Sequence, residues 1–430
     1  MSKTFRPYQP DQVLLLPPAL GDWVPEGHLS RFVNEVVDGL DLRAIEDTYA
    51  EEERGAPPYH PRLMVKVLLY AYATGTYSSR RIAAQLEDSV AFRFLGADNR
   101  PDFRTISDFR QRHGAALAAL FAQVLRLCQK AGLVKLGRVA IDGTKLKANA
   151  SKHKAMSYGR MKRAAAALEQ EVTALLHRAE QTDADEDRRY GPEQRGDELP
   201  AALAHREGRL KKIRQAMAEL QAEAQQEAHA AGRDPRGVEP ADEAQRNFTD
   251  PESRIQKQGR DYLQGYNAQV AVDAQAQVIV AQAVTAKASD VQELIPLVQR
   301  IPPVLRRRPQ LVLADAGYWS EANVKHLERL RIEPFIATQR YKHTEALPPA
   351  PRGRRPAGLS VKARMARKLL TLKGRAVYAW RQILPEPVFG QIKHARGFRQ
   401  FLRRGLRRVR EDWAMICTVH NLLKLYHAVA

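Results

Sequence analysis

The first third of the chain carries apolar side chains at the three- and four-residue spacing of amphipathic helices. The spacing predicts short helices separated by polar turns. They lie over residues 29–37, from Pro61 to Gly75, behind Ser78 or Ser79, from Ser89 to Leu95, after Pro101, and over 115–130. A glycine, Gly132, ends the last of them, as is common at helix C-termini. Residues 1–132 are therefore predicted to form an all-α N-terminal domain.

Two longer helical patterns lie between residues 156 and 249. Their apolar positions run from Met161 to Ala179 and from Leu210 to Ala224, with alternating spacings of four and three. The segment between them, 181–200, holds Pro, Gly and mixed charge, which predicts a loop. We expect an antiparallel α-helical hairpin inserted into the following domain. Such a hairpin serves more often as a scaffold or as a contact between copies than as a catalytic site.

Strand patterns lie on both sides of this insertion, over residues 133–155 and 250–410. The apolar run 139–141 ends on Asp142 and a Gly-Thr-Lys turn, and residues 266–273 alternate apolar with polar side chains. The remaining elements are a strand over 277–286, a helix over 290–300, a strand over 311–314, a helix over 320–330 and a strand over 334–338. Three antiparallel strands followed by α/β crossovers predict an α/β domain of the RNase H-like type with a mixed five-stranded sheet. A closing helix is expected within 411–430.

Three carboxylates occupy positions that suit a metal site. Asp142 and Asp315 each end an apolar strand, and Glu386 precedes Pro387, which favours a place at the start of a helix. A lone Asp at a strand end is usually a turn former or a helix cap, so the prediction rests on the three together. Carboxylates are the ligands that Mg²⁺ prefers, and a pair of such ions can activate water and stabilise the leaving oxygen of a phosphodiester. We therefore predict that Asp142, Asp315 and Glu386 are catalytic and bind two Mg²⁺ or Mn²⁺ ions.

The charge balance points to a polyanionic partner. Lysine and arginine number 69 against 49 acidic residues, a formal charge of +20, and nucleic acid is the first candidate for such a chain. The predicted DNA contacts near the carboxylates are Lys145, Tyr378, Arg381 and Lys393, and those in the N-terminal domain are Arg80, Arg81, Arg104 and Arg110. The short N-terminal helices fit a helix-turn-helix reader of DNA. An ordinary helical bundle with a solvated basic face explains their pattern equally well.

The remaining composition argues against secretion and against a membrane. No apolar run approaches the roughly 20 residues that cross a bilayer, and no leader peptide is expected. The two cysteines, Cys128 and Cys417, stand in apolar helical contexts. We expect both to be buried thiols in a reducing compartment, and neither belongs to a zinc-binding pattern.

At these residues the sequence resembles the DDE-type transposases of bacterial insertion sequences. The resemblance rests on seven segments in a fixed order: YHPRLMVKVLLYAYATGTYSSRRI, FRTISDFRQRH, VAIDGTKLKANAS, DPESR, GYNAQVAVD, ADAGYWS and EPVFGQIKHARGFRQFLRRG. It implies a helical DNA-binding domain before an RNase H-like catalytic domain, and divalent ions held by Asp142, Asp315 and Glu386. It also implies that Tyr378, Arg381 and Lys393 form a basic signature around the glutamate.

The resemblance further implies double-stranded DNA as the partner, both at the ends of the element and at the target. A homodimer or a larger assembly on DNA is expected, in the bacterial cytoplasm at the nucleoid. Two other functions stay open from the sequence. One is a stand-alone nuclease with the same fold, and the other is a DNA-binding protein that descends from a transposase and has lost catalysis.

Overall fold

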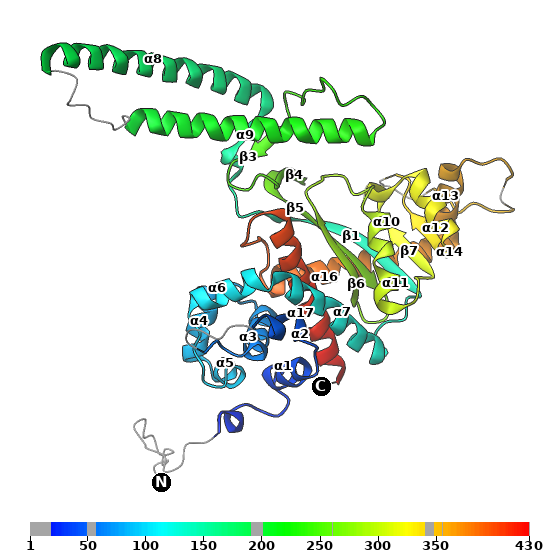
Figure 1. Cartoon of the computed structure of the whole chain (residues 1–430). Helices are drawn as coiled ribbons and strands as arrows, with labels where there is room; N and C mark the ends of the chain where they lie inside the picture. Colours follow the sequence, from blue (N-terminus) through cyan, green and yellow to red (C-terminus); the bar gives the residue numbers. More distant parts are fainter. Residues whose placement is uncertain are drawn as a thin grey trace, which may run out of the picture.

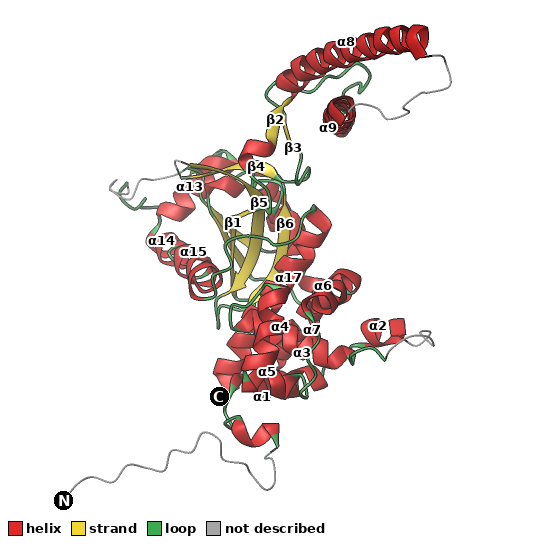
Figure 2. Ribbon diagram, turned by 90° about the vertical axis from the view of Figure 1, so that its left-hand side faces the viewer, coloured by secondary structure: helices red, strands yellow, loops and turns green. Residues whose placement is uncertain are grey.

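The computed structural model describes residues 19–49, 57–190, 201–259, 261–339, 348–354 and 356–429, with the backbone alone described in 178–190 and 201–204. These residues form three parts, which Figures 1 and 2 show from two sides. A cluster of helices comes from the N-terminal segment, a twisted sheet with flanking helices follows, and a long helical hairpin projects away from both.

The N-terminal cluster contains the predicted helices at close to the predicted bounds. In order they are η1 (Leu20–Trp23), α1 (Leu29–Asp38), α2 (Arg43–Glu46), η2 (Asp47–Tyr49), α3 (Pro61–Ala73), α4 (Ser79–Asp88), α5 (Val90–Leu95), α6 (Phe103–Arg112) and α7 (Gly114–Lys130). Helix α3 is buried on nearly every side because it packs against α1, α5 and the last helix of the chain. Its start is fixed by Pro61 in the first turn and by His60, whose side chain accepts a hydrogen bond from the Arg62 amide.

The sheet has six strands, one more than predicted. They are β1 (Arg138–Lys147), β4 (Arg254–Gln258), β5 (Asp261–Asp273), β6 (Ile279–Thr285), β7 (Leu311–Ala314) and β8 (Glu333–Ile336). Across the sheet, β4 and β6 pair with β5, and then come β1, β7 and β8. Strands β4, β6 and β1 run antiparallel to β5, whereas β1, β7 and β8 are mutually parallel. The unpredicted strand is β4, which forms a hairpin with the first part of β5.

Strand β1 does not end at Asp142, so the predicted Gly-Thr-Lys turn is wrong. The strand continues to Lys147, and Gly143 pairs with Gln269 of β5 in an unbroken antiparallel register. A Cβ atom at position 143 would collide with the side-chain amide of Gln269. The glycine therefore makes room for a neighbouring side chain and does not turn the backbone. As a result, Asp142 stands in the middle of a strand.

Helices pack against the strands of the sheet. They are α10 (Leu294–Gln299), α11 (Ile301–Leu305), η4 (Ala316–Tyr318), α12 (Glu321–Arg329), α13 (Val361–Leu370), α14 (Leu372–Tyr378), α15 (Trp380–Ile383), α16 (Pro385–Gly390) and a π-helical segment, η5 (Gln391–Ala395). The predicted helix over 290–300 begins later, at Leu294, and leaves Asp290 in the loop before it.

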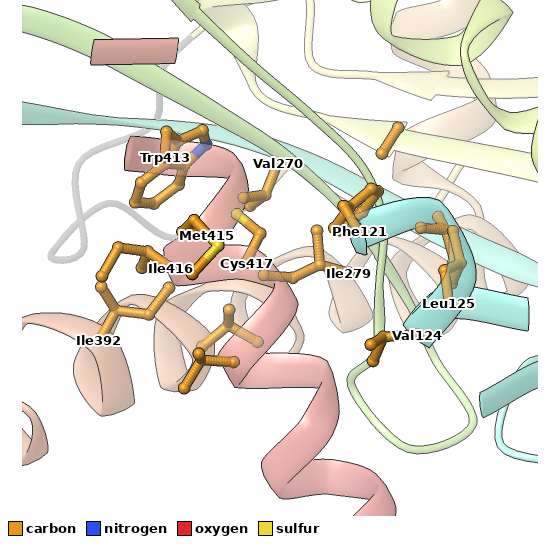
Figure 3. Close-up of a cluster of buried hydrophobic side chains, with 14 of the residues drawn as sticks. Phe121, Val124, Leu125, Val270, Ile279, Ile392, Trp413, Met415, Ile416 and Cys417 are labelled. Carbon is orange, nitrogen blue, oxygen red and sulfur yellow. The ribbon is translucent and has the colours of Figure 1, made fainter. Parts of the chain in front are cut away.

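The last helix, α17 (Leu406–Val429), joins the helical cluster to the sheet. It packs against α7 and α3 on one side and against β6 on the other. Figure 3 shows Trp413, Ile416 and Cys417 among side chains of α7 and of strands β5 and β6. Trp413 is fully buried and its Nε1 donates to the Gln269 carbonyl at 3.2 Å. One continuous apolar core therefore runs through the helical cluster and the sheet. Both cysteines are buried in it, as predicted.

The hairpin has an apolar core of its own. It consists of α8 (Tyr158–Tyr190) and α9 (Ala201–Ala230), and a small ribbon, β2 (Ala155–Ser157) with β3 (Gln245–Asn247), connects it to the sheet. The predicted apolar positions Met161, Leu168, Ile213 and Leu220 are buried between the two helices. Helix α8 takes up the first half of the predicted loop, and residues 191–200 lie outside the described residues. Among the helices that the structure describes, none combines the length and the apolar character needed to cross a bilayer.

Candidate active site

Two of the predicted carboxylates stand side by side on neighbouring strands. Strands β1 and β7 are parallel, and Ile141 pairs with Ala314. Asp142 is the next residue of β1, and Asp315 directly follows the last residue of β7. The two therefore occupy equivalent positions, where neighbouring strands lie about 4.8 Å apart. Each carboxylate accepts a hydrogen bond at 2.8 Å from a nearby amide, Asp142 from Gly143 and Asp315 from Gly317. The two side chains are thus held at one point of the sheet.

A third carboxylate, Asp290, joins them, and the sequence did not predict it. A Cβ atom placed at Gly317 would lie 2.9 Å from Asp315 Oδ1 and 3.4 Å from Asp290 Oδ2, so the two carboxylates flank the same point. Asn267 and Gln269 of β5 donate to Asp290 Oδ1 at 2.6 and 2.7 Å. Both amides are fully buried. The sequence signal that could have revealed Asp290 was the pair of amide side chains, Asn267 and Gln269, within a mostly apolar strand.

Burial raises the pKa of Asp142 to about 6. The charges of Asp315 and Asp290 act in the same direction, whereas Arg381 and the Gly143 amide oppose them. A carboxyl whose ionised form is disfavoured by burial and by like charges is stabilised by any cation that reaches it. The electrostatics of this point therefore favour a bound cation.

Arg381 is the cation that reaches the carboxylates from the helical side. Its Nη2 lies 3.4 Å from Asp142 Oδ2. Burial works to lower the pKa of Arg381, but Asp142, Tyr378, Asp315 and Glu386 outweigh it and hold the pKa above the usual value. The predicted neighbour Tyr378 donates its hydroxyl to the Ala314 carbonyl at 3.3 Å, and burial raises the pKa of that hydroxyl to about 12. The side chains of Arg381 and Tyr378 thus lie next to Asp142 and Asp315.

Two lysines complete the surroundings. Lys145 Nζ lies 3.8 Å from Asp290 Oδ1 and donates to the Ala288 carbonyl, and burial lowers the pKa of Lys145. Lys393 Nζ donates to the Lys145 carbonyl at 3.0 Å. The structure therefore brings Lys145, Arg381 and Lys393 to the same strand as Asp142.

Glu386 differs from the two aspartates. It lies in the first turn of α16, as Pro387 suggested, and its side chain is exposed. Its charge acts on Arg381. In the part of the chain that the structure describes, no three or more His, Cys, Asp or Glu side chains form a ready-made metal cage. The donor chemistry nevertheless fits a hard divalent ion, because Asp142, Asp315 and Asp290 offer carboxylate oxygens and the buried Asn267 Oδ1 has no hydrogen-bond partner.

The N-terminal arginines fall into two groups. Arg80, Arg81 and Arg104 are exposed, and both Arg80 and Arg104 lie over the ring of Phe103. Arg110 does not join them, because its guanidinium donates to the Tyr72 hydroxyl, the Tyr77 carbonyl and the Ser79 hydroxyl. It fixes α6 to the α3–α4 junction, so its guanidinium is engaged within the protein.

Two family models match the chain. A "Transposase domain (DUF772)" matches residues 18–112 and a "Transposase DDE domain" matches residues 235–422. The second range contains Asp290, Asp315 and Glu386, and Asp142 lies between the two ranges. No solved structure matches the chain.

A curated relative agrees with both models. It is the "Putative transposase for insertion sequence element IS402" of Burkholderia cepacia, which is 37% identical over 89 residues. The match covers 19% of this chain and 42% of the relative, so less than half of that relative's length is represented. The two family ranges together take up about two thirds of the chain, in the order helical segment, then carboxylate-bearing segment. The chain therefore carries two segments that match transposase domain families, and the second of them is the DDE domain family.

Proposed function

We propose that the chain is a DNA transposase that binds the terminal inverted repeats of its element, cuts the DNA there and joins the ends to target DNA. One observation carries the proposal: Asp142 and Asp315 occupy equivalent positions on neighbouring parallel strands, with Lys145 and Arg381 beside them. The antiparallel strands β1, β5 and β6, followed by the parallel strands β7 and β8, support an RNase H-like assignment of the sheet.

Divalent ions belong to this proposal, in the form of two Mg²⁺ or Mn²⁺ ions per site. Asp142 and Asp315 would hold them together with Asp290 or Glu386. Bound there, the ions supply Lewis acidity that activates water and neutralises charge on the leaving oxygen. Asp290 is close to Asp315 as the chain stands, whereas Glu386 is exposed at a helix start. Glu386 therefore remains a proposed ligand on the strength of its place beside Arg381.

The cationic side chains have a separate task in the proposed reaction. Arg381 and Lys393 are partly buried and carry positive charge to strand β1, where the scissile phosphate would lie. Burial in a low-dielectric setting strengthens the attraction of such a cation for phosphate. Tyr378, which donates to the Ala314 carbonyl, holds the strand end from the other side. We assign binding and orientation of the scissile phosphate to Arg381, Lys393 and Lys145.

The remaining parts are proposed to bring DNA and copies of the chain together. Residues 1–132 would act as the DNA-binding domain, with Arg80, Arg81 and Arg104 exposed for phosphate contacts. Residues 133–155 and 250–410 would be the catalytic domain, 156–249 the hairpin insertion and 411–430 the closing helix. Assembly as a dimer or larger complex on DNA follows from the need to join two ends, and the place of action would be the bacterial nucleoid.

The test uses a DNA fragment that carries the gene with its natural flanks. Asp142→Asn, Asp315→Asn and Glu386→Gln should each abolish cleavage while binding of the fragment persists or tightens, because the phosphate contacts come from Lys and Arg. Asp234→Asn is the matched control, since Asp234 is an exposed carboxylate that pairs with Arg236 outside the site. Calorimetric titration with Mn²⁺ gives a second readout and should show weaker binding for the site variants alone.

The outcomes separate the competing functions. A variant at one of the three positions that cuts at the unchanged rate shows that this carboxylate holds no metal. Cutting without any dependence on two element ends would identify a stand-alone nuclease. Binding with no metal-dependent cutting in the unchanged chain would identify a DNA-binding protein that has lost catalysis.

A further inference from the structure

A groove of about 480 Å³ lies at the root of the hairpin, where it meets the ribbon that leads to the sheet. Six of its ten lining residues are Lys, Arg or His. The polar residues that line it are His153, Lys154, Arg160, His205, Arg209 and Lys212. Its lining contains no acidic side chain, and the four Lys and Arg side chains are exposed to solvent.

The cations of the groove differ from others on the same hairpin. Arg206 pairs with Glu171, and Arg214 pairs with Glu169. Within the described part of the chain, Lys154, Arg160, Arg209 and Lys212 form no ion pair. Four cations around one hollow repel each other, so an anionic ligand there would be stabilised by all of them.

The groove is also held in shape. Met156, Ile213 and Phe248 line it, and all three belong to or pack against the apolar core of the hairpin. The Phe248 amide donates to the Lys154 carbonyl, and the Ser151 hydroxyl caps the short turn that carries His153 and Lys154. The basic side chains therefore project from fixed backbone and do not belong to a loose tail.

A basic path connects the groove with the candidate active site. Strand β1 leads from Asp142 to Lys147 over about 17 Å, half the length of one duplex turn. The segment 399–404 runs beside the end of this strand, where the Lys147 amide donates to the Arg399 carbonyl and Arg404 Nε donates to the Asn149 carbonyl. Arg399 and Arg404 are exposed. Positive charge thus continues from Lys393 to Lys154.

We propose that this groove binds the phosphate backbone of double-stranded DNA and positions the duplex that enters the active site. The inference rests on the proposed function, because it takes the polyanion to be the substrate DNA. It gives the hairpin a direct part in DNA binding, in contrast to the scaffold or contact between copies expected from its sequence. Flexible cations that each neutralise one phosphate suffice for such a role, which carries no base specificity.

The experiment compares two double variants of the full chain. Arg209→Gln with Lys212→Gln removes two groove cations. Lys211→Gln with Arg233→Gln removes two exposed cations that lie outside the groove. Each protein is titrated against a fluorescent mixed-sequence duplex of about 40 base pairs between about 50 and 200 mM salt. Circular dichroism checks that both variants keep the helical content of the unchanged chain.

The groove variant should lose two phosphate contacts. Since each contact contributes about 0.9 to the slope of log K against log salt, the slope should fall by about 1.8. Affinity at about 0.1 M salt should fall by about tenfold or more. The control variant should keep a slope within about 0.5 of the unchanged chain.

The alternative results are distinguishable. Equal slopes for the two double variants overturn the groove as a DNA site and leave the proposed function intact, provided that the unchanged chain still binds and cuts. A groove variant that binds DNA normally but sediments at a lower mass would assign the groove to a contact between copies, which also overturns the inference. An unchanged chain whose DNA binding does not depend on salt would overturn the proposed function itself.

Discussion

Asn421 of α17 takes the place of a missing strand partner, and its replacement should destabilise the protein. The side chain is fully buried, its Oδ1 accepts from the Ile279 amide at 2.8 Å, and its Nδ2 donates to the Ile279 carbonyl at 2.8 Å. Ile279 begins β6, which pairs with β5 on one side. One asparagine thus satisfies both backbone groups of a strand residue that faces a helix.

Asn421→Leu keeps a similar volume but leaves both groups of Ile279 without a partner. A buried polar group that loses its partner costs about 1–3 kcal/mol, so we expect unfolding to be easier by about 2–6 kcal/mol. Thr418→Val is the control one turn earlier in the same helix. Its hydroxyl donates only to the Ala414 carbonyl of that helix, so this change should cost about 1 kcal/mol or less.

Asn421→Asp gives a sharper test, because the loss of stability that it causes should depend on pH. The carboxylate keeps the acceptor for the Ile279 amide but turns a second oxygen towards the Ile279 carbonyl. Burial should raise the pKa of this carboxyl above its unfolded value, and the protonated form can donate where Nδ2 did. The variant should therefore be least stable at pH 7 and should gain stability relative to the unchanged chain as the pH falls towards 4.

Urea unfolding followed by tryptophan fluorescence measures these differences, since Trp413 lies on the same helix and is buried. Far-ultraviolet circular dichroism follows the whole chain in parallel. A loss of less than about 1 kcal/mol for Asn421→Leu would refute the reasoning, because it would mean that Ile279 finds other partners. If Asn421→Asp instead lost stability relative to the unchanged chain as the pH falls, the assigned hydrogen bonds would be contradicted.

Three further changes test other parts of the structure. Gly143→Ala should cost about 1–3 kcal/mol in urea unfolding, because the methyl group must displace Gln269; an unchanged midpoint would show that Gln269 moves freely. Asp290→Asn should weaken Mn²⁺ binding in calorimetry without lowering the urea midpoint, and equal affinity would remove Asp290 from the site. Burial lowers the pKa of His420 to about 3. As the pH falls, His420 therefore binds a proton in the unfolded chain before it does so in the folded chain. The free energy of unfolding should be lower by about 2 kcal/mol at pH 5 than at neutral pH. His420→Gln should remove this part of the pH dependence in denaturant titrations at both values.

The helices and the principal strands were predictable because each pattern is local. Leu63, Val67 and Ala71 lie on one side of a helix whatever the rest of the chain does, and Asp315 follows its short apolar strand as expected. The same local rule failed at Gly143. A glycine after an aspartate resembles a turn, but here it accommodates Gln269 from a strand more than 120 residues away. Only the paired strand reveals that reason.

The candidate site was predictable in part for the same reason. Asp142 and Asp315 could be found because each ends an apolar run, but their register depends on the pairing of β1 with β7. Asp290 resembled the first residue of a helix, and only the amides of Asn267 and Gln269 show that it turns to the sheet instead. In the sequence, Arg110 resembles the other arginines of a basic helix. Its hydrogen bonds to Tyr77 and Ser79 depend on tertiary packing, which the local pattern does not reveal.

The place of α17 in the core has a consequence for how the chain is made. Helix α17 packs against helices that are synthesised long before it, since about 275 residues separate the end of α7 from the first residue of α17. At the usual speed of synthesis a ribosome needs about 14–55 s for that stretch. During this time the apolar sides of α3 and α7 that later pack against α17 are exposed to solvent. They can then bind chaperones or aggregate. The nascent chain therefore cannot complete its apolar core until α17 has been synthesised. A truncated chain that lacks α17 would keep these sides of α3 and α7 exposed permanently.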